Sequence, residues 1–414
     1  MERYERYKDS GVKWIGEIPG HWGMYKLKYL FKLNKNKNIG NKCNTILSLS
    51  YGKIKIKKDL NEGLTPESYE SYQLLSTGDI VIRSTDLQND HTSLRTGLVK
   101  IEGAITSAYI GLKNLDMSLC DSRFYHYFLH DWDITKAIYN QGKGLRQSLN
   151  WDDIKNMLIP VLDISEQTAI ANYLDSTTAK IDEAIAQQQK MIDILNERKQ
   201  IIINNAVTKG LNPDAPMKDS GVDWIGEIPE HWEVMQYRHL FYNLDKLRQP
   251  ISADKRSRNN PQYDYYGASG VIDKIDYYNV ENKVLLIGED GANLLLRNLP
   301  LIYKAEGKFW VNNHAHILKP IKDDYDFMAY VMEAADYTLF ITGSAQPKLS
   351  QSNLNAVKLP IPPLEEQKSI VDYLAQRTEK IDLAIVNATK LISLLQERKQ
   401  IIINDVVTGK VKVS

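Results

Sequence analysis

The side chains best suited to catalysis in this sequence lie in two short segments. Glu289, Asp290, His314 and His316 supply carboxylate and imidazole groups, which can hold a hard metal ion in a nuclease. No further partner stands at a ligand-like spacing from them. Polar groups satisfied inside a strand-rich core are therefore the favoured interpretation of these four residues.

Two other catalytic motifs are missing from the sequence. An adenine methyltransferase needs an Asn/Asp-Pro-Pro-Tyr motif, and the nearest tetrapeptide, Asn260-Pro-Gln-Tyr263, has Gln at the critical place and is interpreted as a turn. The Gly-x-x-x-x-Gly-Lys-Ser/Thr phosphate loop of ATP-driven motors does not occur. We therefore predict no catalytic residue and no metal site in this chain.

Lysine clustering is a stronger chemical signal than any of these motifs. Residues 25–148 hold 18 Lys and Arg against 12 Asp and Glu, although the whole chain has no net charge. Ten lysines and no acid lie within residues 25–58. A local basic face of this kind is typical of phosphate binding, and a solvated lysine-rich surface is the alternative.

Side chains that can read base edges are frequent in the second half. Amide, imidazole and guanidinium groups suit purines in the major groove, and polar loops at residues 142–149 and 343–349 carry several of them. A turn that closes the domain is the alternative for each single residue. The residues predicted to contact DNA are Lys53, Lys55, Lys57, Lys58, Arg83, Arg95, Arg146, Gln147, Arg256, Arg258, Arg297, Asn312, Asn313, His314, Gln346 and Lys348.

An internal repeat must position these residues. Residues 8–22 return at 218–232 with 13 of 15 positions identical, an offset of 210. A second repeat begins at Leu149 and Leu349, an offset of 200, and ends with the same Glu-Arg-Lys-Gln-Ile-Ile-Ile-Asn. Between the repeated parts lie two unlike stretches, 25–148 and 235–348. The chain thus places two different modules on two copies of one frame.

Long helices are expected at the end of each copy. Apolar residues recur every seven positions in both, from Leu174 to Ile202 and from Leu374 to Ile402, and neither Pro nor Gly interrupts residues 165–209 or 364–408. This spacing is typical of a coiled coil. Antiparallel pairing of the two helices would give the chain a pseudo-twofold axis near Gln188 and Ala388.

We predict an α+β fold, with two small α+β target recognition domains separated by two long helices that form an antiparallel coiled coil. Strands are expected at 52–57, 79–83, 282–288 and 316–319, and helices at 122–139 and 327–339. The predicted division is 1–148 (first recognition domain with its head repeat), 149–210 (central helical region), 211–348 (second recognition domain with its head repeat) and 349–414 (C-terminal helical region).

Composition excludes several classes of protein. Two cysteines, Cys43 and Cys120, exclude a disulfide scaffold and a zinc site of four thiolates. The charged first ten residues lack the apolar stretch of a signal peptide, and the apolar runs are too short to cross a membrane. We expect a cytoplasmic protein that does not contact a membrane.

The whole chain, from Lys8 to about Val407, resembles the specificity subunit of type I restriction–modification enzymes. The features that carry the resemblance are the Lys-Asp-Ser-Gly-Val-x-Trp-Ile-Gly-Glu-Ile-Pro-x-His-Trp heads, Leu359-Pro-Ile-Pro-Pro-Leu-Glu-Glu-Gln367, the repeated helix ends, Gly267-Ala-Ser-Gly270, Ile287-Gly-Glu-Asp-Gly291 and Trp310-Val-Asn-Asn-His-Ala-His316. One departure is Ile159-Pro-Val-Leu-Asp-Ile-Ser-Glu-Gln167, which lacks the double proline and puts the local turn in doubt.

The resemblance implies a non-catalytic reader of double-stranded DNA. Each recognition domain would bind one half of an asymmetric, bipartite site, and the helices would set the gap between the halves. Two methyltransferase (M) subunits would dock on the chain, and restriction (R) subunits would complete the endonuclease. No cofactor is expected in this chain, since S-adenosylmethionine, ATP and Mg would bind the partner subunits.

Two other functions stay open from the sequence. The chain could guide a related system in which methyltransferase and nuclease are fused, or it could be a structural coiled-coil adaptor without nucleic acid. Neighbouring genes would separate the first of these from a type I system, and salt-dependent retention on DNA would exclude the adaptor.

Overall fold

The computed structural model describes residues 2–57, 68–90, 94–139, 148–256, 259–343 and 346–413. These residues form two compact units. Unit 1 contains residues 1–189 together with 390–414, and unit 2 contains residues 190–389. Each unit therefore joins one head and one recognition module to parts of both long helices. The predicted linear boundaries follow the sequence repeat, whereas the units follow the packing.

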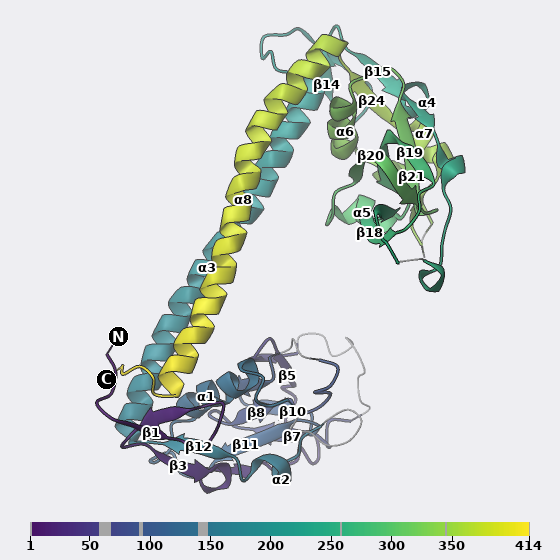
Figure 1. The fold of residues 1–414 in the computed structure, drawn as a ribbon. Helices are drawn as coiled ribbons and strands as arrows, with labels where there is room; N and C mark the ends of the chain where they lie inside the picture. Colours follow the sequence, from purple (N-terminus) through teal and green to yellow (C-terminus); the bar gives the residue numbers. More distant parts are fainter. Residues whose placement is uncertain are drawn as a thin grey trace. The chain divides into compact units, whose positions relative to one another are not determined.

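Two long helices run through both units. They are α3 (Ile164–Lys209) and α8 (Leu364–Val407), drawn in teal and yellow in Figure 1. In unit 1 the first part of α3 lies beside the last part of α8, where Lys399 Nζ is 2.6 Å from Asp182 Oδ1. In unit 2 the remaining parts pair through Lys199 and Asp382, also at 2.6 Å. The predicted antiparallel pairing is confirmed within each unit.

In the described part of the chain, unit 1 contains short strands and two short α-helices besides parts of the long helices. Among its described residues, the largest sheet has the order β4–β11–β8–β9, and α1 packs against β9. Its elements besides the long helices are β1 (Tyr7–Asp9), β2 (Glu17–Pro19), β3 (Gly23–Lys26), β4 (Phe31–Leu33), β5 (Leu47–Ser50), β6 (Lys53–Ile56), β7 (Gln73–Leu75), β8 (Ile80–Ile82), β9 (Thr96–Leu98), β10 (Gly103–Ile105), β11 (Ile110–Asn114), α1 (Ser122–Ile134), α2 (Trp151–Ile154) and β12 (Leu158–Val161).

Unit 2 has longer strands. Within its described part, one sheet has the order β16–β21–β19–β20–β17–β18 and is antiparallel except between β17 and β20. The elements are β13 (Met217–Asp219), β14 (Glu227–Pro229), β15 (Glu233–Gln236), α4 (Tyr237–Leu240), β16 (Phe241–Asn243), β17 (Tyr263–Gly267), β18 (Gly270–Ile275), β19 (Val280–Gly288), α5 (Gly291–Leu296), β20 (Ile302–Val311), β21 (Ala315–Pro320), α6 (Tyr325–Ala334), β22 (Ile341–Thr342), β23 (Lys348–Leu349), α7 (Gln351–Ala356) and β24 (Lys358–Ile361).

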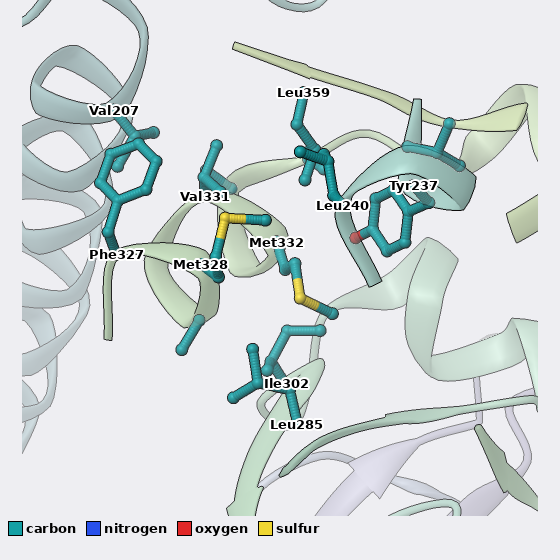
Figure 2. Close-up of a cluster of buried hydrophobic side chains, with 14 of the residues drawn as sticks. Val207, Tyr237, Leu240, Leu285, Ile302, Phe327, Met328, Val331, Met332 and Leu359 are labelled. Carbon is teal, nitrogen blue, oxygen red and sulfur yellow. The ribbon is translucent and has the colours of Figure 1, made fainter. Parts of the chain in front are cut away.

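The apolar seams of the long helices end in the cores of the units. Figure 2 shows part of the unit 2 core, where Val207 of α3 lies close to Phe327 of α6. The corresponding core of unit 1 buries Leu174 of α3 and Val407 of α8 with Trp132 of α1. Burial of these residues removes apolar surface from water and holds each module on its helix pair.

The repeated head fastens each module to the start of a helix. In unit 1, Glu166 of α3 accepts hydrogen bonds from Trp22 Nε1 at 3.2 Å and lies 2.9 Å from His21 Nε2. In unit 2, Glu366 of α8 makes the same contacts with Trp232 and His231, at 3.1 and 2.8 Å. The spacing shared by the two copies of the repeat therefore places a His and a Trp of the head against a Glu of the long helix in each unit.

The missing double proline leaves the helix start unchanged. Asp163 precedes α3, and its Oδ1 accepts a hydrogen bond from Ser165 N at 2.9 Å. Pro363 precedes α8, and its carbonyl accepts one from Gln367 N at 3.0 Å. Gln167 N donates to Asp163 O at 2.9 Å, the same main-chain contact as at Pro363, and the Asp163 carboxylate adds a side-chain cap at α3.

Candidate nucleic-acid interface

The predicted base-reading residues of unit 2 meet at one end of its sheet. The β20–β21 turn carries Asn313 and His314, and the segment around β23 carries Gln346 and Lys348. All four side chains are exposed. Backbone contacts join the two segments through Glu289, whose N–H donates to His314 O at 2.8 Å and whose carbonyl accepts from Leu349 N at 2.9 Å.

Further contacts hold this tip in place. Asp290 forms a β-bridge with Lys348, and its carboxylate lies 3.7 Å from His314 Nδ1. Gly291 N donates to Pro347 O at 2.7 Å. Because the chain is fixed by main-chain bonds on both sides, the four exposed side chains extend from a defined backbone, as base readout requires.

Beneath the tip lies a buried polar chain. His316 Nδ1 is 2.6 Å from Asp245 Oδ2, and His316 Nε2 is 2.9 Å from Leu349 O. Burial opposes ionisation of Asp245, but hydrogen bonds from His316 and Ile317 N and the charge of Arg248 keep its pKa below the usual range. His316 is therefore a satisfied core residue, as the sequence interpretation favoured.

Arg248 is a residue of this tip that the sequence analysis did not single out. Its guanidinium donates to Asn313 O at 3.3 Å and lies 3.5 Å from Glu289. It thus ties the turn that carries Asn313 to the end of β19 beside it. The basic stretch 236–258 was the available signal, but six basic residues there give no reason to choose Arg248.

Three predicted residues of unit 2 brace the module instead. Arg297 donates to Glu333 O at 2.9 Å and Ala335 O at 2.5 Å, at the end of α6. Arg256 lies over the Tyr265 ring at 4.3 Å and 3.1 Å from Asp273. Asn312 is 6% exposed, and its Oδ1 accepts from His314 N. Each of the three thus makes a contact within the fold, and their role in base readout stays a prediction. Arg258 lies outside the described residues.

In unit 1 the lysines lie on a β-hairpin. Tyr51 and Gly52 both have positive φ, 48° and 71°, as a tight two-residue turn requires, and they join β5 to β6. Lys53 and Lys55 of β6 are exposed, and Lys57 is partly buried. This position suits contacts with phosphates. Lys58, Arg146 and Gln147 lie outside the described residues.

Arg83 and Arg95 differ in their surroundings. Arg83 is partly exposed and lies 3.3 Å from Asp90. Arg95 is 0% exposed, and its guanidinium donates to the carbonyls of Arg83, Thr85, Asp86 and Asp90. Every donor direction of Arg95 is turned toward the protein, so the prediction that it contacts DNA is wrong. It holds the loop that follows β8.

Both modules close in the same way on the segment before the helical frame. Leu149 N donates to Ser84 O at 2.8 Å in unit 1, as Leu349 N donates to Glu289 O in unit 2. In the described part of the chain, no group of three or more His, Cys, Asp or Glu side chains has metal-binding geometry. No helix in that part has the length and apolar character of a membrane span.

Comparison with known proteins shows what the chain is similar to. Residues 229–391 match the family model of the type I restriction modification DNA specificity domain. The MjaX type I restriction enzyme specificity subunit of Methanocaldococcus jannaschii is 26% identical over 439 residues, which cover 98% of both chains. The chain is thus similar over nearly its whole length to a type I specificity subunit, and its second half matches the specificity-domain model.

Two further comparisons agree with this similarity. One of Haemophilus influenzae, S.HindORF215P, is 33% identical over 132 residues, covering 32% of this chain and 33% of the relative. A solved chain from work on complex assembly and conformational transition of the type I R-M system has a TM-score of 0.69 at 14% identity. The superposition covers 95% of this chain and 99% of that chain and shows a shared fold.

Proposed function

We propose that this specificity subunit reads a bipartite, asymmetric DNA site, with one half-site for each unit. The observation that carries the proposal is the tip of unit 2, where Asn313, His314, Gln346 and Lys348 are exposed on a backbone fixed from both sides. Unit 1 has the same closing contact but a different module, which supports reading of an unlike sequence.

The chain also docks two methyltransferase subunits, and restriction subunits complete the complex. Exposed apolar side chains on the long helices support such docking, since large apolar residues in water mark protein contacts. In unit 2 these include Met191, Leu383 and Val386, at 50, 60 and 61% exposure. In unit 1 they include Leu394 and Ile401, both at 51%.

Catalysis takes place in the partners rather than in this chain. The methyltransferase subunits bind S-adenosylmethionine and methylate adenine, and the restriction subunits use ATP and Mg. The specificity subunit supplies sequence recognition and geometry. The contacts of His316 support this division, because both of its ring nitrogens have hydrogen-bond partners within the fold, Asp245 and Leu349 O.

Reconstitution with methylation mapping tests the proposal. The full chain, a cognate methyltransferase subunit and S-adenosylmethionine should together methylate a split motif that sequencing of the product DNA reveals. Omission of either protein should abolish methylation. Exchange of residues 25–148 for those of another specificity subunit should change only the first half-site. Methyl transfer by the purified chain alone, or a change in both half-sites, would contradict the proposal.

A further inference from the structure

A cleft in unit 1 separates the β5–β6 hairpin from the helix pair. It has a volume of about 1070 Å³ and is lined by the hairpin, β9, α1, α3 and α8. Lys53 and Lys55 enter it from the hairpin, Lys100 from the segment after β9, and Lys399 from α8. A space of this size takes a ligand of several phosphate groups or a short stretch of nucleic-acid backbone.

Positive charge exceeds negative charge in this cleft. The carboxylates that line it are Asp175 and Asp182. Asp175 is already paired with Arg123 at 3.1 Å, outside the lining. Asp182 lies 2.6 Å from Lys399 and 3.9 Å from Lys53. Among the described residues, no ion pair includes Lys55 or Lys100. The lysines therefore outnumber the acids that can neutralise them.

The corresponding position in unit 2 has a different ionisable residue. Helices α1 and α6 begin at equivalent positions, because the backbone N–H groups of their N-caps, Asp121 and Asp324, donate to Gln167 and Gln367. His130 of α1 thus corresponds to Glu333 of α6.

Glu333 is an acidic residue at a position where unit 1 has none. Burial raises the pKa of Glu333, and the charge of Lys199, the counterpart of Lys399, opposes this rise, so Lys199 has Glu333 as an acidic neighbour besides Asp382. In unit 1, burial and the charge of Lys399 lower the pKa of His130 to about 4, so the imidazole is neutral at pH 7. At this position, therefore, unit 1 has a neutral imidazole where unit 2 has a carboxyl group.

We propose that this cleft binds phosphate groups, and that Asp182 pairs with Lys399 and Lys53 when no phosphate is present. Several ammonium groups around one space suit a multiply charged anion, and each can turn its donors toward a phosphate oxygen. A DNA backbone and a free polyphosphate share this chemistry. The DNA source rests on the proposed function, whereas binding of a free polyphosphate does not.

The first experiment titrates pyrophosphate into the full-length chain by calorimetry. Asp182→Asn should tighten binding about fivefold, since it removes one competing charge at a partly exposed site. Replacement of Lys55 and Lys100 by Gln should weaken pyrophosphate binding by about tenfold or more, because it removes two positive charges that attract the anion. The matched control is Asp382→Asn, which removes the equivalent helix contact in unit 2 and should leave pyrophosphate affinity unchanged.

A second experiment measures binding of a nonspecific duplex at several salt concentrations, with the cognate methyltransferase present. If the backbone occupies the cleft, the Lys55 and Lys100 double variant should flatten the salt slope by about two units. Pyrophosphate should also compete with the duplex. Altered slopes identify DNA as the source, and pyrophosphate binding with unaltered slopes identifies a free phosphate compound.

The two proposals fail separately. Equal pyrophosphate affinities of Asp182→Asn and Asp382→Asn, with no loss of affinity in the Lys55 and Lys100 double variant, would overturn the cleft proposal, even if the wild-type chain reads DNA. If the wild-type chain does not bind DNA but the variants show the expected order of pyrophosphate affinities, the proposed function is overturned and phosphate binding in the cleft is supported. Thermal unfolding of each variant checks that the fold is intact.

Discussion

Lys399 of α8 donates a hydrogen bond to Asp182 of α3 at 2.6 Å, and its counterpart Lys199 donates to Asp382 at the same distance. Each long helix therefore supplies one lysine and one aspartate to these contacts. Because the sequence repeats, the same contact forms in both units. Because the helices pair antiparallel, a single repeated sequence satisfies both contacts.

The two ion pairs should behave independently. Lys399→Glu places a carboxylate beside Asp182 and should lower the free energy of unfolding by about 1 kcal/mol, measured with urea. Combination with Asp182→Lys should restore stability. Combination with Asp382→Lys should not, because Asp382 belongs to the other pair. Rescue by both combinations would contradict the pairing.

Arg95 should matter for folding rather than for recognition. Arg95→Met leaves four partly buried carbonyl groups without their donor and should cost about 3 kcal/mol in the free energy of unfolding, seen as a lower melting temperature. Arg83→Met is the matched control, with an expected cost below about 1 kcal/mol because Arg83 is partly exposed. A stable Arg95→Met protein with an altered methylation motif would show that Arg95 reads DNA.

Changes at the unit 2 tip should alter the choice of one half-site. Gln346→Ala or Asn313→Ala should reduce discrimination at one position of that half-site by about 1–3 kcal/mol, the range for one lost base contact. Methylation mapping measures the effect. Both side chains are exposed, so the melting temperature should stay near the wild-type value. An unchanged motif in both variants would remove these residues from base readout.

The hairpin lysines should act on every sequence alike. Joint replacement of Lys53, Lys55, Lys57 and Lys58 by Ala should weaken binding to all duplexes and flatten the salt slope by up to about four units, because lysine contributes a mobile charge without base selectivity. Titrations at several salt concentrations give the slope. A changed sequence preference with an unaltered slope would argue against phosphate contacts.

Acid should destabilise unit 1 through His126. Burial, with the charges of His130 and Lys100, lowers the pKa of His126 from 6.5 to about 3. The unfolded chain therefore takes up a proton below pH 6.5 that the folded chain does not, and stability falls as the pH falls. Between pH 6.5 and 5 this amounts to about 2 kcal/mol.

The comparison with His126→Gln isolates this effect. The variant should lose less stability than the wild type over the same pH range, measured by urea unfolding. Burial raises the pKa of Asp131 to about 6, which acts in the opposite direction, but this group is present in both proteins and its contribution cancels. Parallel pH profiles for the two proteins would show that His126 does not titrate as described.

The frame of the molecule could be predicted from local sequence signals. Helices expected at residues 165–209 and 364–408 are found at Ile164–Lys209 and Leu364–Val407. A heptad of apolar residues and the nearest Pro and Gly fix such helices without distant contacts. The helix expected at 122–139 already ends at Ile134, since its last predicted residues form turns that depend on neighbours.

The roles of individual polar residues were decided by the tertiary structure. Arg83 and Arg95 have the same chemistry, yet one is partly exposed and the other is enclosed by four backbone carbonyls. Likewise the sequence shows lysines near residue 53, but only the fold brings them to Lys399 across a cleft. The internal repeat and the heptad spacing of apolar residues are local properties that can be recognised in the sequence alone. Burial and charge balance depend on residues far apart in the chain, and only packing determines which of them meet.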